Sequence, residues 1–282
     1  MQETCSLTSS MMQNEQLDKR IVAVIRERGF SELSVVQEQA IPKILAGGHL
    51  LLIAPTGTGK TESAMIPVLS GMLQSSGKGF TTLYITPLRA LNRDILRRME
   101  WWCQKLGLTS GVRHGDTTQA ERRKQVLHPP DLLITTPETV QALFMGKRLR
   151  EHLRTVRYVI VDEIHDLAGT KRGAQLAIAM ERLCRYAGEF QRIGLSATVG
   201  NPDEVSIFLT GDRSCSIVEV PVAKTLDIRV EVTGEKFESQ VEAIRRHTRK
   251  DHSTLIFVNT RSTAESLGHA LIKDGRTDVH HG

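Results

Sequence analysis

Residues 50–61 read Leu50-Leu51-Leu52-Ile53-Ala54-Pro55-Thr56-Gly57-Thr58-Gly59-Lys60-Thr61. An apolar run typical of a buried strand leads into a glycine-rich turn, and the apolar spacing after it predicts a helix over 60–73. A strand, such a turn and a helix in immediate succession are typical of a phosphate-binding loop, although alanine replaces the first glycine of the pattern. The segment therefore predicts a nucleoside triphosphate bound at the end of a parallel sheet.

The turn offers several kinds of phosphate contact. Its glycines let backbone N–H groups point inward, and the helix N-terminus adds partial positive charge. Lys60 can reach the β- and γ-phosphates, and Thr61 can bind Mg²⁺. A Rossmann dinucleotide loop is excluded, because it needs a third glycine where this chain has Glu62. The residues expected to bind ATP here are Thr56, Gly57, Thr58, Gly59, Lys60 and Thr61.

A second signal lies at Val159-Ile160-Val161-Asp162-Glu163-Ile164-His165, where a buried strand ends in two carboxylates. At the carboxyl edge of a parallel sheet, Asp162 suits the role of Mg²⁺ ligand and Glu163 that of the base that activates water. Taken alone, such a pair is an ordinary strand end. Together with the phosphate loop it predicts an ATP-hydrolysis site. His165 fits a hydrogen-bonding coupler better than a metal ligand, because no other ligand cluster is evident.

Short apolar runs alternate with longer amphipathic ones along most of the chain, which predicts an α/β fold: a parallel sheet with helices on both faces. Five strands are expected at 49–54, 82–86, 132–135, 158–162 and 192–196. We expect a flexible tail over 1–15, a first domain over 16–212, a linker over 213–225 and part of a second domain over 226–282. In that second part, strands are expected at 226–232 and 254–259, and two or three α/β units are too few to close a sheet of their own.

Composition limits the class of protein. The chain has 282 residues, 40% hydrophobic content and a formal net charge of +5, which is compatible with a polyanionic partner without proving one. Its longest apolar stretch is far shorter than the roughly 20 residues of a membrane span. No secretory signal is visible, and the four cysteines show no CxxC pairing, so we expect a cytoplasmic protein.

These segments resemble the superfamily 2 helicases of the DExH type, most closely the large helicase-related (Lhr) family of ATP-dependent DNA helicases. The resemblance runs from about residue 15 to the end of the chain. Its longer runs are His114-Gly115-Asp116-Thr117, the stretch from Pro129 to Glu138, Lys171-Arg172-Gly173 and the stretch from Leu195 to Asn201. It implies RecA-like domains, the second incomplete here, and ATP- and Mg²⁺-dependent 3′→5′ movement on single-stranded DNA, with unwinding of duplexes or hybrids in DNA repair.

The resemblance also assigns further residues. Phe30 and Gln37 correspond to the group that reads adenine, since an amide can pair with the adenine edge. Ser196 and Thr198 correspond to the segment that couples hydrolysis to strand movement. The residues expected to grip the nucleic-acid backbone are Thr86, Pro87, Arg89, Gly115, Thr135 and Thr136. Hydroxyls and N–H groups at helix starts suit phosphate oxygens, although each threonine on its own could equally be a plain helix cap.

One departure from the family bears on activity. Helicases of this type carry two arginines in a later Gln-x-x-Gly-Arg-x-x-Arg segment that reaches the γ-phosphate, and the 282 residues contain no such segment. Loss of such arginines typically lowers turnover by about 10³–10⁵-fold, so we expect the chain by itself to bind nucleotide and hydrolyse it poorly. Two alternatives remain open: a nucleotide-dependent clamp on single strands that does not unwind, and an RNA helicase. The latter is weakened by Ile164-His165, where DEAD-box enzymes have Ala-Asp. A serine hydrolase is disfavoured, because Ser196 lacks the final glycine of a nucleophile elbow.

Overall fold

The computed structural model describes residues 17–29, 32–74, 79–87, 89–221, 227–234, 236–248, 253–272 and 277–280, without the side chains of 89–94. The chain divides into two compact units, Met1–Ala223 and Lys224–Gly282, each of which is described by itself.

The first unit contains a parallel seven-stranded sheet in the order β3-β4-β2-β5-β6-β1-β7. Its strands are β1 (His49–Ile53), β2 (Thr82–Ile85), β3 (Ser110–Arg113), β4 (Leu132–Thr135), β5 (Tyr158–Val161), β6 (Gln191–Ser196) and β7 (Cys215–Glu219). The central strands are buried on both faces, which is why they read as continuous apolar runs rather than as alternating ones.

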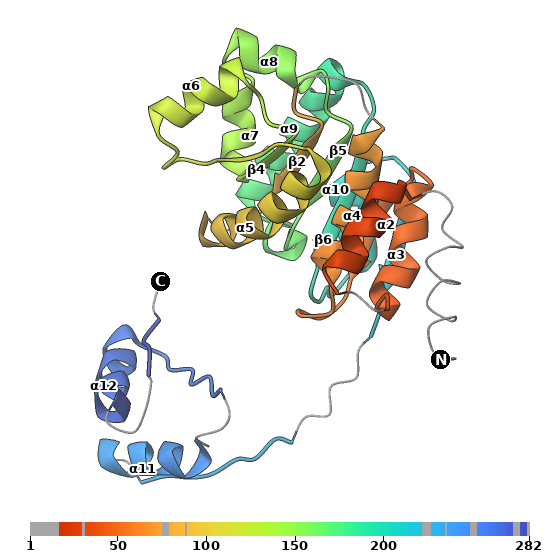
Figure 1. The fold of residues 1–282 in the computed structure, drawn as a ribbon. Helices are drawn as coiled ribbons and strands as arrows, with labels where there is room; N and C mark the ends of the chain where they lie inside the picture. The colour runs from red at the N-terminus through yellow and green to blue at the C-terminus, as the bar shows by residue number, and fades with distance from the viewer. Residues whose placement is uncertain are drawn as a thin grey trace, which may run out of the picture. The chain divides into compact units, whose positions relative to one another are not determined.

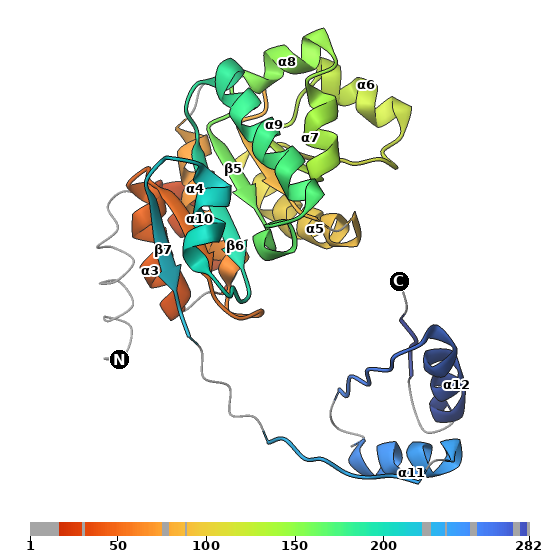
Figure 2. The ribbon, with the colours of Figure 1, turned by 180° about the vertical axis from the view of Figure 1, so that it is seen from behind.

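Helices cover both faces of this sheet (Figures 1 and 2). The helices of the first unit are α2 (Lys19–Glu27), α3 (Val35–Leu45), α4 (Lys60–Leu73), α5 (Arg89–Leu106), α6 (Gln119–Leu127), α7 (Pro137–Leu143), α8 (Lys147–Leu153), α9 (Lys171–Ala187) and α10 (Pro202–Thr210), with a 3₁₀ turn η1 at Ile164–Asp166. Alternate strand residues supply two cores. Leu50 and Leu52 pack with α2 to α5, and Leu51 and Ile53 pack with α7 to α10. The α/β fold with helices on both faces is confirmed.

Two strands were not expected from the sequence. β3 contains a single aliphatic side chain, Val112, and lies at one edge of the sheet. β7 lies within the linker expected at 213–225, where Cys215–Glu219 pairs in parallel with β1. Both are edge strands with one neighbour each, and only β3 is poor in apolar residues, since β7 also contains Ile217 and Val218. The first unit consequently extends past residue 212.

The second unit contains two helices among its described residues, α11 (Phe237–His247) and α12 (Arg261–Leu271). Val241, Leu267 and Leu271 form a small core between them. The strands expected at 226–232 and 254–259 are not formed in the parts of these ranges that the structure describes. A parallel strand is stabilised by hydrogen bonds to a neighbour, and Val230, for example, is 92% exposed.

Among the described residues, none of the helices combines the length and the apolar character that crossing a membrane requires.

Gly173, in the first turn of α9, is a position where packing forbids a side chain. A Cβ there would lie 2.0 Å from the carbonyl oxygen of Leu167, which already accepts hydrogen bonds from the Thr170 N–H and hydroxyl. Because these hydrogen bonds fix the Leu167 carbonyl in place, it cannot move away from an added Cβ. Gly173→Ala is therefore expected to lower the free energy of unfolding by about 1–3 kcal/mol. Urea titration measures it, and Gly200→Ala is the control, since a Cβ there meets nothing within 4 Å. Equal unfolding midpoints in the two variants would contradict the packing argument.

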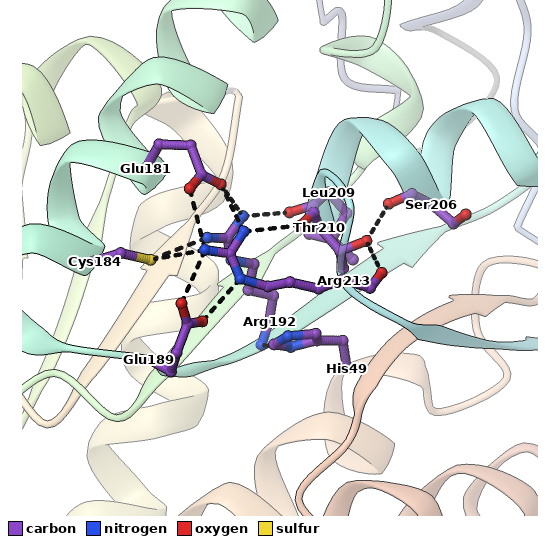
Figure 3. A network of polar contacts seen from close by, with 9 residues as sticks. All are labelled: His49, Glu181, Cys184, Glu189, Arg192, Ser206, Leu209, Thr210 and Arg213. Atoms are coloured by element: carbon purple, nitrogen blue, oxygen red, sulfur yellow. Dashed lines mark hydrogen bonds and ion pairs between the residues drawn. The ribbon is translucent and has the colours of Figure 1, made fainter.

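A polar network ties α9, β6 and the loop before β7 together at the edge opposite the phosphate loop (Figure 3). Arg192 on β6 is 1% exposed and donates to Glu181, to the Leu209 carbonyl and to the Cys184 sulfur. Arg213 donates to both Glu181 and Glu189. The two guanidinium groups thus share the Glu181 carboxylate, which helps to compensate the buried charge of Arg192.

His49, at the start of β1, makes this region sensitive to pH. Its Nδ1 accepts the N–H of Arg192 at 3.1 Å, and burial, with Arg192 and Arg213 nearby, lowers the pKa of His49. A lowered pKa means that the unfolded chain binds the proton more tightly, so stability is complete above the ordinary histidine pKa of about 6.5 and is lost as pH falls below it. We expect the urea concentration at the unfolding midpoint to decrease as the pH is lowered from 7.5 to 5.5. The decrease should be smaller in His49→Asn, which keeps a hydrogen-bond acceptor but does not titrate. Identical pH profiles for the two proteins would exclude His49 as the cause.

Candidate active site

The site is built at one edge of the sheet, because all seven strands are parallel and their carboxyl ends meet there. The phosphate loop follows β1, the Asp162–Glu163 pair follows β5, and β6, which lies between these two strands, ends at Ser196. The strand order therefore brings together three segments that are widely separated in the sequence.

The phosphate loop has the backbone that its glycines were expected to allow. Gly57 and Gly59 have φ of +82° and +89°, a region that other residues rarely adopt. The Thr58 hydroxyl donates to the Pro55 carbonyl at 2.7 Å, and Ser34 on the preceding segment donates to the Thr58 carbonyl at 3.1 Å. These bonds fix the turn, and Gly59 is the N-cap residue of α4.

Lys60 occupies an unusual position for a lysine. It is 7% exposed, and its buried Nζ has no hydrogen-bond partner among the described atoms. Burial lowers the pKa of Lys60, while the nearby charges of Glu163 and Asp162 act to raise it. An ammonium group held out of water without a partner is costly unless an anionic group binds there. The structure thus brings Lys60 and the carboxylate pair together.

Asp162 is held by its surroundings on both carboxylate oxygens. The Tyr84 hydroxyl on β2 donates to Oδ2 at 2.7 Å, and the Glu163 N–H donates to Oδ1 at 3.0 Å. The residue is 8% exposed, and burial raises the pKa of Asp162. Each oxygen retains a lone pair beyond these bonds, so the carboxylate can still bind a cation.

Glu163 has a left-handed backbone, with φ 45° and ψ 46°, and is the one non-glycine residue with positive φ in the described part of the chain. This turn lets β5 pass directly into η1. Burial and the charge of Asp162 raise the pKa of Glu163. A backbone held in a sparsely populated region is typical of functional sites.

A polar chain leads from Glu163 to the end of β6. His165 Nδ1 lies 3.5 Å from Glu163 Oε2 and 2.9 Å from the Ser196 hydroxyl, and that hydroxyl also bonds to the Thr198 carbonyl at 3.2 Å. His165, Ser196 and Thr198 are therefore connected to the carboxylate pair, and their coupling role stays a prediction. For Thr198 the connection runs through its main chain.

The group expected to read adenine is described in part. Phe30 lies outside the described residues. Gln37 is buried at the start of α3, where it forms a reciprocal cap with Ser34: Gln37 Oε1 accepts the Ser34 N–H, and the Ser34 hydroxyl accepts the Gln37 N–H. Its Nε2 lies 3.0 Å from the position that a Cβ on Gly59 would take. The Ser-x-x-Gln spacing could have predicted this cap, which places Gln37 against the phosphate loop.

The residues expected to grip nucleic acid lie at the ends of β2, β3 and β4, on the same edge as the nucleotide site. Thr86, Pro87, Thr135 and Thr136 are buried, and Gly115 is exposed. The Thr135 hydroxyl donates to the Arg113 carbonyl at 2.8 Å, and the Thr136 hydroxyl pairs with that of Thr139. Thr86 Oγ1 is buried without a partner among the described atoms. The Arg89 side chain lies outside the described residues.

Two polar residues at this edge were not predicted as site residues. Tyr84 lies in a strand, where tyrosine usually indicates packing, and its bond to Asp162 crosses 78 residues of sequence. Arg172 bonds to Glu138 and donates to the Pro87 carbonyl at 2.9 Å, so it joins the turns that follow β2 and β4. Only the resemblance of Lys171-Arg172-Gly173 to a known family pointed to Arg172.

Comparison with known proteins gives a consistent result. The DEAD/DEAH box helicase family matches residues 34–205. The chain is 39% identical over 274 residues to the ATP-dependent helicase Lhr-Core of Methanothermobacter thermautotrophicus, covering 86% of this chain and 32% of that protein. It is 35% identical to the Lhr helicase/uracil glycosylase of Escherichia coli, covering 85% of this chain and 18% of that one.

A solved structure also matches. Helicase Lhr of Mycobacterium smegmatis, bound to single-stranded DNA and AMP-PNP, aligns with a TM-score of 0.79 at 35% identity and covers 92% of this chain and 36% of that one. The expected RecA-like fold is confirmed by this match. The chain spans about a third or less of the length of these relatives.

Proposed function

Since the chain belongs to the DEAD/DEAH box helicase family, we propose that it is the ATP-binding motor portion of a DNA helicase that moves 3′→5′ on single strands. The observation that carries the proposal is Lys60, whose buried and unpartnered ammonium lies beside the Asp162–Glu163 pair. Similarity to a helicase bound to single-stranded DNA and AMP-PNP supports the choice of ligands.

The residues have distinct tasks in this proposal. The phosphate loop and Lys60 hold the β- and γ-phosphates, and Gln37 and Phe30 bind adenine. Glu163 takes the proton from the attacking water, and the His165–Ser196 chain relays the change to β6. Thr61 and Asp162 present the oxygen ligands that Mg²⁺ prefers, and Mg²⁺ would neutralise phosphate charge during transfer.

Nucleic acid would lie over the ends of β2, β3 and β4. With Thr86, Thr135 and Thr136 buried, the contacts proposed for these turns come chiefly from Gly115 and Arg89. We include action in DNA repair and in the cytoplasm in the proposal, supported by the Lhr resemblance and by the free thiols of Cys103, Cys184 and Cys215.

The second candidate is a clamp that binds single strands in response to nucleotide without moving. The 282 residues lack the arginine segment expected to complete the γ-phosphate site, which favours this candidate for the chain by itself. One experiment separates the two. Fluorescence anisotropy measures binding of a labelled oligonucleotide with and without AMP-PNP, and phosphate release measures turnover with and without that strand.

The outcomes of this experiment are distinct. DNA-stimulated turnover supports the motor, whereas binding tightened by AMP-PNP without turnover supports the clamp. An affinity for the oligonucleotide that is the same with and without nucleotide would contradict both candidates. A DNA strand and an RNA strand of the same sequence, compared at one salt concentration, test the choice of DNA.

A further inference from the structure

Tyr84 occupies a central position between two parts of the site. It belongs to β2, which pairs with β5, and two residues later the same segment reaches the Thr86–Pro87 turn proposed to contact nucleic acid. Its side chain is on the face of the sheet that packs against α4 and α5, and is fully buried. It therefore lies inside the core, where it cannot act as a surface for bases.

The phenol of Tyr84 contacts Asp162, one of the two residues proposed to bind the cation. It donates to Asp162 Oδ2 at 2.7 Å. This bond joins β2 to the residue that follows β5, its neighbour in the sheet.

From this bond we infer that Tyr84 is a positioning residue for the divalent cation, which orients the Asp162 carboxylate so that one of its oxygens faces the ion. The inference rests on the proposed nucleotide site and adds to it a residue that is neither a phosphate contact nor a cation ligand. Packing alone would be served by phenylalanine. The hydroxyl adds a charge-assisted bond that selects one orientation of the carboxylate, and outer partners of this kind commonly matter 10- to 100-fold for metal affinity.

The test compares Tyr84→Phe with Tyr186→Phe. Tyr186 packs its ring against Phe144 in the other core, so the control removes a hydroxyl away from the site. Fluorescent ADP is titrated first in EDTA and then against rising Mg²⁺. The expected result is equal affinity in EDTA for all three proteins, and a half-saturating Mg²⁺ concentration about 10-fold or more higher in Tyr84→Phe alone.

A second measurement needs no substitution of Tyr84, so it can be made even if Tyr84→Phe does not fold. The whole chain contains three tyrosines, so incorporation of 3-fluorotyrosine gives three ¹⁹F resonances. Addition of Mn²⁺ with ADP is expected to broaden the Tyr84 resonance more strongly than those of Tyr158 and Tyr186, since the Tyr84 phenol is bonded to Asp162, one of the proposed ligands.

Each outcome can be interpreted. An unchanged Mg²⁺ requirement in Tyr84→Phe overturns the inference and leaves the proposed nucleotide site intact. A Tyr84 resonance that Mn²⁺ does not broaden overturns the inference together with the proposed role of Asp162 as a cation ligand. A Tyr84→Phe affinity that falls equally with and without Mg²⁺ also overturns it, because it indicates a structural role only. Failure of the unaltered chain to bind ADP would overturn both the inference and the proposed function.

Discussion

A Glu163→Gln variant is expected to hydrolyse ATP about 10²- to 10⁴-fold more slowly than the unaltered chain, while binding AMP-PNP with the same affinity. Glutamine keeps the shape of the side chain and its place in the left-handed turn, but it cannot accept a proton from water. The loss should therefore appear in the rate of phosphate release and not in nucleotide affinity. Because turnover by this chain is expected to be slow, the assay uses enzyme in excess over ATP and follows a single turnover.

The pH profile provides a second check on Glu163. Burial and Asp162 raise the pKa of this carboxyl, and a base must be deprotonated to act. The rate of the unaltered chain is thus expected to fall on the acid side at a pH above the ordinary glutamate range. Glu204→Gln, an exposed glutamate of α10, serves as the control. Equal rates in Glu163→Gln and Glu204→Gln would remove Glu163 from the role of base.

A Lys60→Ala variant is expected to bind AMP-PNP about 10- to 150-fold more weakly, the equivalent of one charge-assisted hydrogen bond of about 1.5–3 kcal/mol. The direction follows from the geometry, because Nζ is buried beside the site and bonded to nothing else among the described atoms. Isothermal titration calorimetry in the presence of Mg²⁺ measures the change. Lys43→Ala, an exposed lysine of α3, is the matched control and should bind as the unaltered chain does.

Stability separates a binding role of Lys60 from a structural one. Removal of a buried charge that lacks a partner relieves a desolvation cost, so Lys60→Ala is expected to unfold at the same urea concentration as the unaltered chain or at a higher one. If the variant instead unfolded more easily and kept its nucleotide affinity, Lys60 would be a structural lysine.

The positions of the central strands could be predicted closely, because each of these strands is a short apolar run. The expected range 132–135 matches β4, and the other four central strands differ from their expected ranges by about one residue. β3 and β7 could not be predicted in the same way. β3 contains little apolar sequence and β7 is a run of five residues inside the expected linker, so only the pairing with β4 and β1 identifies them.

The candidate site likewise contains residues that could be predicted from the sequence and residues that could not. Lys60, Asp162 and Glu163 could be placed from sequence, because a parallel sheet brings the ends of its strands to one edge. The contacts of Tyr84 and Arg172 depend on which strands are neighbours, and the strand order is not readable from local pattern. The burial of Thr135 likewise depends on a bond to the Arg113 carbonyl of β3, a strand that the sequence did not reveal.

The left-handed backbone at Glu163 places stability and catalysis in conflict at one position. An L-residue in that region costs about 1–2 kcal/mol, and glycine would adopt it freely. Glycine at position 163 would also delete the carboxylate. Directed evolution for heat resistance alone would therefore favour glycine here. The more stable variant would lack the proposed base for ATP hydrolysis.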